Sequence, residues 1–225
     1  MNICIEDFFD LKETIASELF AGLLYPWEAL PLIRDFIVRL GKTLDPARFE
    51  KRGETVWIAK SAKVFDSAYL GDHIIIDEEA EVRHCAFLRG NAIVGKKATV
   101  GNSTELKNVI LFNCVEVPHY NYVGDSILGF HAHMGAGSIT SNVKADRTNV
   151  IVKGADWEIE TGLRKFGAML GDWAEIGCNA VLNPGTVIGP HTNVYPTVSV
   201  RGVIPAHHIV KDSTIIVPKR DASAS

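Results

Sequence analysis

The run from Ile58 to Lys107 carries an aliphatic residue at every sixth position without a break. The aliphatic positions are Ile58, Val64, Leu70, Ile76, Val82, Leu88, Val94, Val100 and Leu106. An alanine stands two residues before most of them. A helix has a period near 3.6 and a strand a period of 2, so neither explains a strict period of six. One large and one small apolar residue per hexad indicates an all-β fold, the hexapeptide β-helix, whose coils stack about 4.8 Å apart.

The six-residue frame is interrupted twice before it resumes toward the C-terminus. Between Lys107 and Tyr120 the frame slips, which predicts a loop or a bulged corner. A second departure from the coil covers 142–166, and the frame then resumes. The resumed positions are Leu170, Ile176, Leu182, Ile188, Val194 and Val200. Departures from a rigid scaffold are where functional residues concentrate.

The chain ends differ in texture from the repeats. Apolar residues at helical spacing over 7–24 and again over 26–40, with Tyr25-Pro26 between them and Gly41 after, predict an N-terminal α-helical hairpin. Its surplus apolar surface should pack on the β-helix end or on a neighbouring subunit, and we favour a cap over the open end. We expect a helical appendage (1–50), a β-helix domain (51–205) and a C-terminal tail (206–225), disordered from Lys219 onward.

Charge, cysteine spacing and hydropathy argue against nucleic-acid binding, disulfide bonds and a membrane span. The net charge is −4, with acidic and basic residues interspersed, so no basic field indicates nucleic-acid binding. The four cysteines show no C-x-x-C spacing, and no secretory signal precedes them, which favours a reduced, cytoplasmic protein. No apolar run reaches the about 18 residues that cross a bilayer, so no membrane partner is expected.

Glycine usually follows the aliphatic position, but at Arg83, Arg89 and Lys107 a cation stands there instead. Arg89 and Lys107 are eighteen residues apart, which is one full coil. We expect them at the same corner of adjacent coils with their side chains stacked in one direction. Like charges about 5 Å apart cost free energy unless an anion bridges them, and a phosphate suits both side chains. Alternatively, both are solvated, either splayed apart or paired with Glu105.

Three histidines raise the question of proton transfer or metal binding. His119 lies about two-thirds of a coil beyond Lys107, and histidine is a natural proton acceptor at neutral pH, although a structural role is the alternative. His131 and His133 raise the possibility of zinc, but catalytic zinc needs three protein ligands and no such set is apparent. We therefore assign no metal site.

Three motifs in order resemble one enzyme family. They are Glu105-Leu106-Lys107, the stretch Val117-Pro118-His119-Tyr120-Asn121-Tyr122-Val123-Gly124-Asp125, and Gly135-Ala136-Gly137-Ser138-Ile139-Thr140-Ser141-Asn142. They are similar to the acetyltransferase domain of the bifunctional glucosamine-1-phosphate N-acetyltransferase / N-acetylglucosamine-1-phosphate uridylyltransferase. The resemblance covers roughly Phe87 to Val200. It implies a left-handed parallel β-helix, a homotrimer, acetyl-CoA as co-substrate and no tightly bound cofactor.

The resemblance also assigns roles to individual residues. His119 matches the general base. The matching substrate-binding residues are Arg89 and Lys107 at the phosphate, Tyr122, His133, Asn142 and, if 144–162 is an insertion, Lys165. Ala136 and Cys178 fall where the family meets acetyl-CoA. His133 stands in place of the usual asparagine and Val143 in place of an aromatic residue, and no uridylyltransferase region is present in the sequence.

Together these features predict an acetyl-CoA-dependent N-acetyltransferase. The expected acceptor is an amino-sugar phosphate such as glucosamine 1-phosphate, in UDP-N-acetylglucosamine and cell-envelope precursor synthesis. The departures at His133 and Val143 keep open a binding module that retains the scaffold and has lost the chemistry. A zinc lyase is a third, weaker alternative.

Overall fold

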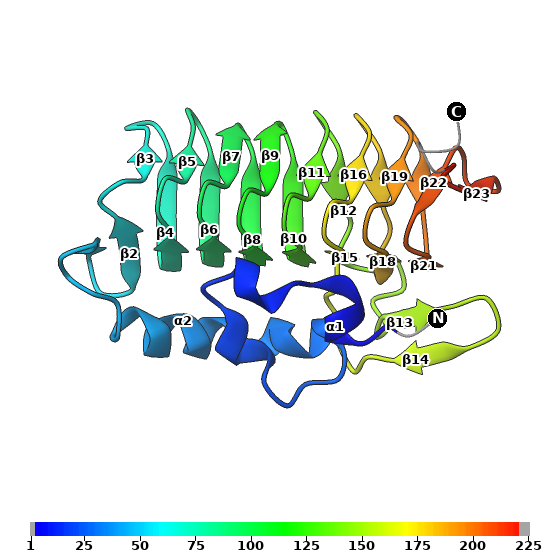
Figure 1. Ribbon diagram of the computed structural model, residues 1–225, viewed down its shortest axis with the longest axis horizontal. Coiled ribbons are helices and arrows are strands. Elements are labelled where there is room, and N and C mark those ends of the chain that lie inside the picture. Colours follow the sequence, from blue (N-terminus) through cyan, green and yellow to red (C-terminus); the bar gives the residue numbers. More distant parts are fainter. Residues whose placement is uncertain (1–2, 221–225) are drawn as a thin grey trace.

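The chain forms a parallel β-helix with an N-terminal segment along one side (Figure 1). The computed structural model describes residues 3–220. One sheet forms the first face of the coil and consists of β3 (Lys63–Val64), β5 (Glu81–Val82), β7 (Thr99–Asn102), β9 (Glu116–His119), β11 (His133–Met134), β16 (Glu175–Ile176), β19 (Asn193–Val194), β22 (His208–Val210) and β23 (Ile216–Pro218). The predicted hexapeptide β-helix is thus confirmed.

A second sheet bends around a corner and supplies the other two faces. Four long strands turn this corner, namely β4 (Tyr69–Ile76), β6 (Phe87–Val94), β8 (Glu105–Leu111) and β10 (Tyr122–Leu128). Their first residues join β12 (Ile139–Thr140), β17 (Val181–Leu182) and β20 (Ser199–Val200) in the second face. Their last residues join β2 (Val56–Ala59), β15 (Ala168–Leu170), β18 (Thr186–Ile188) and β21 (Val203–Ile204) in the third face.

Aliphatic side chains of the repeating frame fill the inside of the coil. Val82, Leu88 and Val94, one from each face, have no exposed surface, and their counterparts in the next coils are buried in the same way. Because side chains alternate along a strand, the residue before each of them points away from the coil axis. On the first face these outward residues are mostly polar, for example Glu81 and Glu116.

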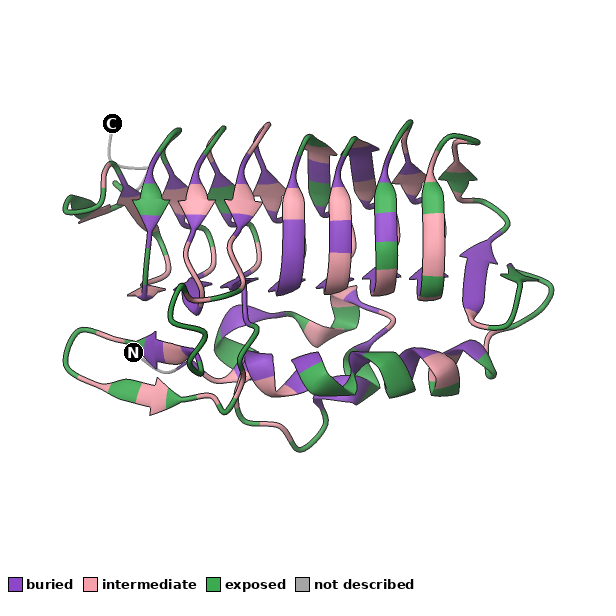
Figure 2. Cartoon of the chain, turned by 180° about the vertical axis from the view of Figure 1, so that it is seen from behind, coloured by how far each residue is buried: buried purple, intermediate pink, exposed green. Residues whose placement is uncertain are grey.

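The third face differs because its outward residues are apolar too. This outer row consists of Trp57, Ile75, Ile93, Ile110, Ile127, Met169 and Val187, all of them buried. A strand that is buried on both sides reads as a continuous apolar run, as Ile74-Ile75-Ile76 does. The third face therefore needs a cover, and Figure 2 shows buried residues where it meets the N-terminal segment.

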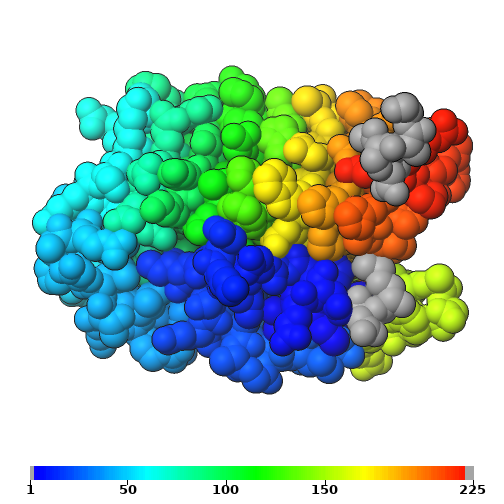
Figure 3. All heavy atoms as spheres, viewed as in Figure 1, coloured from blue at the N-terminus to red at the C-terminus, as the bar shows by residue number. Residues whose placement is uncertain are grey.

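The N-terminal segment supplies this cover over β4, β6, β8 and β10, whereas the excursion over 142–166 lies beside the last coils (Figure 1). Helix α2 (Ile33–Gly41) runs across β4, β6 and β8, and the rings of Phe9 and Phe20 lie 5.0 and 5.8 Å from that of Phe112. Figure 3 shows the segment pressed along the side of the coil. The predicted cap over the coil end is therefore wrong, because the largest apolar surface lies along the third face. The end of the coil is instead paired by β1 (Phe49–Arg52), which runs antiparallel to β2.

The first arm of the predicted helical hairpin is mostly 3₁₀ turns. It contains α1 (Ile5–Phe8), η1 (Leu11–Glu13) and η2 (Ser17–Phe20), whereas η3 (Pro26–Leu32) continues directly into α2. Asp10 accepts from the Lys12 N–H at 3.0 Å, and Thr14 Oγ1 accepts from the Ala16 N–H at 3.1 Å. Such local bonds compete with a continuous helix, so the helical spacing of apolar residues over 7–24 overstated the helix.

Both predicted departures from the frame occur at the corner between the second and third faces. Leu88 lies opposite Leu106, but Gly90 lies opposite Lys107, so Arg89 forms a bulge and no loop is needed over 107–120. The excursion over 142–166 contains β13 (Ile151–Lys153) paired with β14 (Glu158–Glu160). Its ends meet, since the Phe166 N–H donates to the Asn142 carbonyl at 3.0 Å.

The C-terminal part of the coil extends further than predicted. The expected tail over 206–225 contains β22, which continues the first face, and β23, which pairs antiparallel with it. The expected disorder from Lys219 falls largely on 221–225, which lie outside the described residues. Among residues 3–220 no helix is long and apolar enough to cross a membrane.

Candidate functional site

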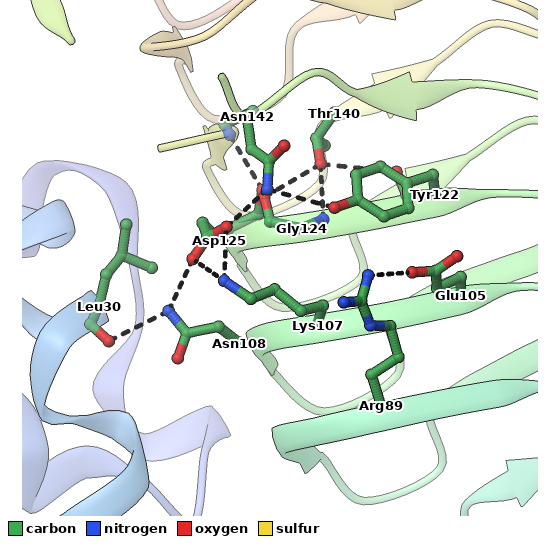
Figure 4. A network of polar contacts seen from close by, with 12 residues as sticks. Leu30, Arg89, Glu105, Lys107, Asn108, Tyr122, Gly124, Asp125, Thr140 and Asn142 are labelled. Atoms are coloured by element: carbon green, nitrogen blue, oxygen red, sulfur yellow. Dashed lines mark hydrogen bonds and ion pairs between the residues drawn. The ribbon is translucent and has the colours of Figure 1, made fainter. Parts of the chain in front are cut away.

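A polar cluster occupies the corner between the second and third faces, hereafter the polar corner (Figure 4). Lys107 Nζ lies 2.8 and 3.0 Å from the two carboxylate oxygens of Asp125. Asn142 Nδ2 donates to Asp125 Oδ2 at 2.6 Å and to Tyr122 Oη at 3.2 Å. The structure therefore brings together three predicted substrate residues, Lys107, Tyr122 and Asn142, around a carboxylate that had no predicted role.

Asp125 is the centre of this cluster. Its side chain is only 4% exposed, and it also accepts from Asn108 Nδ2 at 3.0 Å. Asn108 in turn donates to the Leu30 carbonyl at 3.2 Å, which ties the N-terminal segment to the site. Asp125 has a φ of 47°, a left-handed conformation that aspartate and asparagine tolerate. The signal in the sequence is its spacing, because Asp125 follows Lys107 by eighteen residues, although the register places Gly124 directly opposite Lys107.

Arg89 and Lys107 share a corner but do not stack. Arg89 Nη1 pairs with Glu105 Oε1 at 2.8 Å on the second face, whereas Lys107 turns the other way to Asp125. The bulge at Arg89 removes the expected alignment, since Gly90 and not Arg89 lies opposite Lys107. The expectation of parallel side chains is therefore wrong. Each cation already has a carboxylate partner, so charge repulsion alone does not call for a bridging anion.

Burial changes the titration of one phenol in the cluster. Burial raises the pKa of Tyr122 above its ordinary value, and the charges of Asp125 and Glu105 raise it further, against a lowering contribution from the Asn142 hydrogen bond. The Tyr122 hydroxyl therefore stays protonated at neutral pH and remains available as a hydrogen-bond donor. On the other side of the cluster, the hydrogen bond to Glu105 raises the pKa of Arg89, which stays charged.

His119, Ala136 and Cys178 follow one another along the corner between the first and second faces, hereafter the histidine corner. The Gly137 N–H donates to the His119 carbonyl at 3.0 Å, and the Asn179 N–H donates to the Ala136 carbonyl at 2.9 Å. The chain makes one coil between His119 and Ala136 and, including the excursion, one more between Ala136 and Cys178. His119 and Cys178 are exposed, and the Cys178 thiol is free. The residue proposed as base and the two proposed acetyl-CoA residues thus form one column, exposed at His119 and Cys178 and half-buried at Ala136.

In a single chain the histidine corner and the polar corner lie on opposite edges of the second face. His119 ends β9 of the first face, and Tyr122 begins β10 of the second face three residues later. Tyr122 extends from its strand to Asn142 at the polar corner. An acceptor that contacted both groups would therefore lie across the second face.

The other predicted residues lie at the margins of these two groups. His133 is on the first face, and its Nδ1 is 3.0 Å from Glu175 Oε2. Lys165 is exposed at the base of the excursion, next to Phe166, whose N–H donates to the Asn142 carbonyl. His131 stacks on Trp173 with ring centroids 4.0 Å apart. Among residues 3–220, no three His, Cys, Asp or Glu side chains gather as a metal site would require.

Comparisons with known proteins agree with the motifs. The family described as the GMPPB C-terminal domain matches residues 70–164. The bifunctional protein GlmU of Methanococcus maripaludis (strain C5) is 34% identical over 138 residues, 60% of this chain and 33% of the relative. The bifunctional sugar-1-phosphate nucleotidylyltransferase/acetyltransferase of Sulfurisphaera tokodaii is 29% identical over 151 residues, 59% of this chain and 38% of the relative.

A relative of similar length was also found. The uncharacterized acetyltransferase YaiX of Escherichia coli is 27% identical over 198 residues, which are 80% of this chain and 84% of the relative. By contrast, the chain spans roughly a third of the length of the two bifunctional relatives. The chain is therefore a hexapeptide-repeat β-helix protein that is similar to the acetyltransferase named in these bifunctional relatives, as its motifs predicted.

Proposed function

We propose that the chain is an acetyl-CoA-dependent N-acetyltransferase whose acceptor is an amino-sugar phosphate, with glucosamine 1-phosphate as the first candidate. The observation that supports the proposal is the column of His119, Ala136 and Cys178, in which the residue assigned as base lies in line with the residues assigned to acetyl-CoA. The similarity to relatives named as acetyltransferases supports it. The expected setting is precursor synthesis for UDP-N-acetylglucosamine in the cytoplasm.

In this mechanism the acceptor amine attacks the thioester carbonyl carbon of acetyl-CoA. The carbon–sulfur bond breaks, and the CoA thiolate leaves. His119 takes the proton that the amine loses and passes it to the leaving thiolate, so atoms and charge balance. The polar corner would hold the acceptor, because fixing both reactants converts a bimolecular encounter into a positioned one.

A homotrimer is part of the proposal. Within one chain the histidine corner and the polar corner lie on opposite edges of the second face. A neighbouring copy would bring a second histidine corner toward the polar corner and complete a site between chains. Light scattering of the purified chain tests this, and a monomer that is fully active would contradict it.

Replacement of His119 tests the catalytic role. His119→Ala should lower turnover of acetyl-CoA with glucosamine 1-phosphate by about 10²-fold or more, the scale of a lost general base. His84→Ala is the matched control, because His84 is an exposed histidine at the same corner two coils earlier. The control should retain near-normal turnover, and thiol release from acetyl-CoA is the assay. Near-normal turnover of His119→Ala with an unchanged fold would remove the assigned role.

A binding module without catalysis is the second candidate. The observation that favours it is that Arg89 and Lys107 already pair with Glu105 and Asp125, so the corner is stable without substrate. A panel of amino-sugar phosphates separates the two functions. Binding of a sugar phosphate with no thiol release across the panel would favour the module, whereas release with any acceptor supports the enzyme.

A further inference from the structure

A hollow of about 340 Å³ lies between helix α2 and the coil, next to the polar corner. Its lining comes from four elements: Arg34 from α2, Asp72 and His73 from β4, Arg89, Gly90 and Asn91 from β6, and Lys107 from β8. The N-terminal segment therefore contributes a charged side chain to the same hollow as two predicted substrate residues. Nothing in the sequence motifs had linked Arg34 to the site.

Arg34 differs from the other cations of the hollow in its partners. Arg89 and Lys107 each pair with a carboxylate, but among residues 3–220 Arg34 has no ion pair. Its only side-chain hydrogen bond there is from Nε to His73 Nε2 at 3.4 Å. The lining holds three permanent cations against the single carboxylate of Asp72. Among the three cations of the hollow, Arg34 is therefore the one that contacts no carboxylate of the described residues.

The backbone fixes the wall of the hollow opposite Arg34. Gly90 follows the bulge with a φ of 141°, and a Cβ there would lie 2.7 Å from the Asp72 carbonyl oxygen. Only glycine fits this close approach without strain. His73 and Asn91 occupy successive left-handed positions, with φ of 58° and 53°. The imidazole of His73 is thus held on a rigid corner and not on a loop.

We propose that Arg34, with His73 beside it, is a further ligand of the acceptor's phosphate group, in the hollow that Arg89 and Lys107 also line. A guanidinium offers a planar fork of N–H donors that matches phosphate oxygens. A volume of about 340 Å³ is at the small end for ligand sites, which favours a monosaccharide phosphate over a nucleotide sugar. The identity of the acceptor rests on the proposed function, whereas the anion subsite rests on these residues alone.

Titration calorimetry of the full chain with inorganic phosphate and with glucosamine 1-phosphate tests the subsite. Arg34→Gln should weaken binding of both by about ten-fold, the size of a lost charge-assisted hydrogen bond. Arg39→Gln is the matched control, because Arg39 lies on the same helix and its guanidinium contacts Phe36, 5.2 Å from the ring centroid. His73→Asn should weaken binding less, and asparagine keeps the left-handed backbone. Equal affinities for the Arg34 and Arg39 variants would overturn the subsite.

Steady-state kinetics distinguish a failure of the Arg34 proposal from a failure of the proposed function. In Arg34→Gln the KM for the acceptor should rise about ten-fold, while the KM for acetyl-CoA stays unchanged. Transfer with an unchanged acceptor KM would overturn the subsite and leave the enzyme proposal intact. Phosphate binding that depends on Arg34, with no transfer to any acceptor, would support the subsite and overturn the enzyme proposal.

Discussion

Replacing Asp125 by asparagine should destabilise the protein strongly. The change keeps the shape and the left-handed backbone preference of the residue but removes the charge that Lys107 contacts at 2.8 and 3.0 Å. An asparagine also has one acceptor oxygen where Asp125 accepts from Lys107, Asn108 and Asn142 on two. Lys107 would then be a cation with a 25% exposed side chain and no counter-charge in contact.

The magnitude follows from burial. Breaking a fully buried pair costs about 3–5 kcal/mol, and because Lys107 keeps some access to water we expect about 2–3 kcal/mol. For a chain of this size that corresponds to a fall in Tm of roughly 5–10 °C. Glu105→Gln is the matched control, since Glu105 and Arg89 in that pair are 32% and 49% exposed. A surface pair contributes about 0–1 kcal/mol, so the control should lie close to wild type.

Urea unfolding followed by circular dichroism measures both variants. Lys107→Met and the double variant Lys107→Met/Asp125→Asn complete a cycle, in which the double variant should lose about 1–3 kcal/mol less than the sum of the single losses. An Asp125→Asn variant as stable as Glu105→Gln, or a cycle with additive losses, would refute the assignment of Asp125 as the centre of the polar corner.

Two further predictions concern the cover over the third face. Ile110→Ala should cost about 2–5 kcal/mol in urea unfolding, because Ile110 is fully buried in the outer row, whereas a loss within about 0.5 kcal/mol would mean that the N-terminal segment does not cover it. Glu78 accepts from Arg48 at 2.8 Å, a hydrogen bond that lowers the pKa of Glu78 below its ordinary 4.5. Between the lowered pKa of Glu78 in the folded protein and its ordinary pKa of 4.5, the unfolded state binds more protons than the folded state. The stabilisation from the Arg48–Glu78 hydrogen bond is therefore present above about pH 4.5 and is lost as pH falls through the folded pKa. Tm measured from pH 3 to 7 should show that component in wild type and not in Arg48→Ala, and identical profiles would contradict it.

The coil was predictable from the sequence because its signal is local and repeated. Each hexad carries the same large and small apolar residues, so Leu88 and Leu106 report one structural position. The excursion over 142–166 was visible for the same reason. The cover of the third face was less visible, although triplets such as Ile74-Ile75-Ile76 signal strands that are buried on both sides.

The site was only partly predictable because its partners come from different coils and from outside the repeats. Spacing placed Arg89 and Lys107 at one corner, but a bulge of one residue turned their side chains apart. Asp125 carries no motif signal of its own, because its relation to Lys107 appears only when opposite charges are compared from coil to coil. Arg34 could not be placed at all, since its position depends on how the N-terminal segment packs on the third face.

The coverage of the third face limits how the molecule can meet others. The coil has three faces, and the third is already covered by the chain itself, so another copy that packed side by side with it would meet the first or the second face. A variant that lacks residues 1–50 would expose the aliphatic side chains of the outer row, and such an apolar surface promotes association. The N-terminal segment thus occupies the one side of the coil whose outward apolar residues would otherwise be exposed.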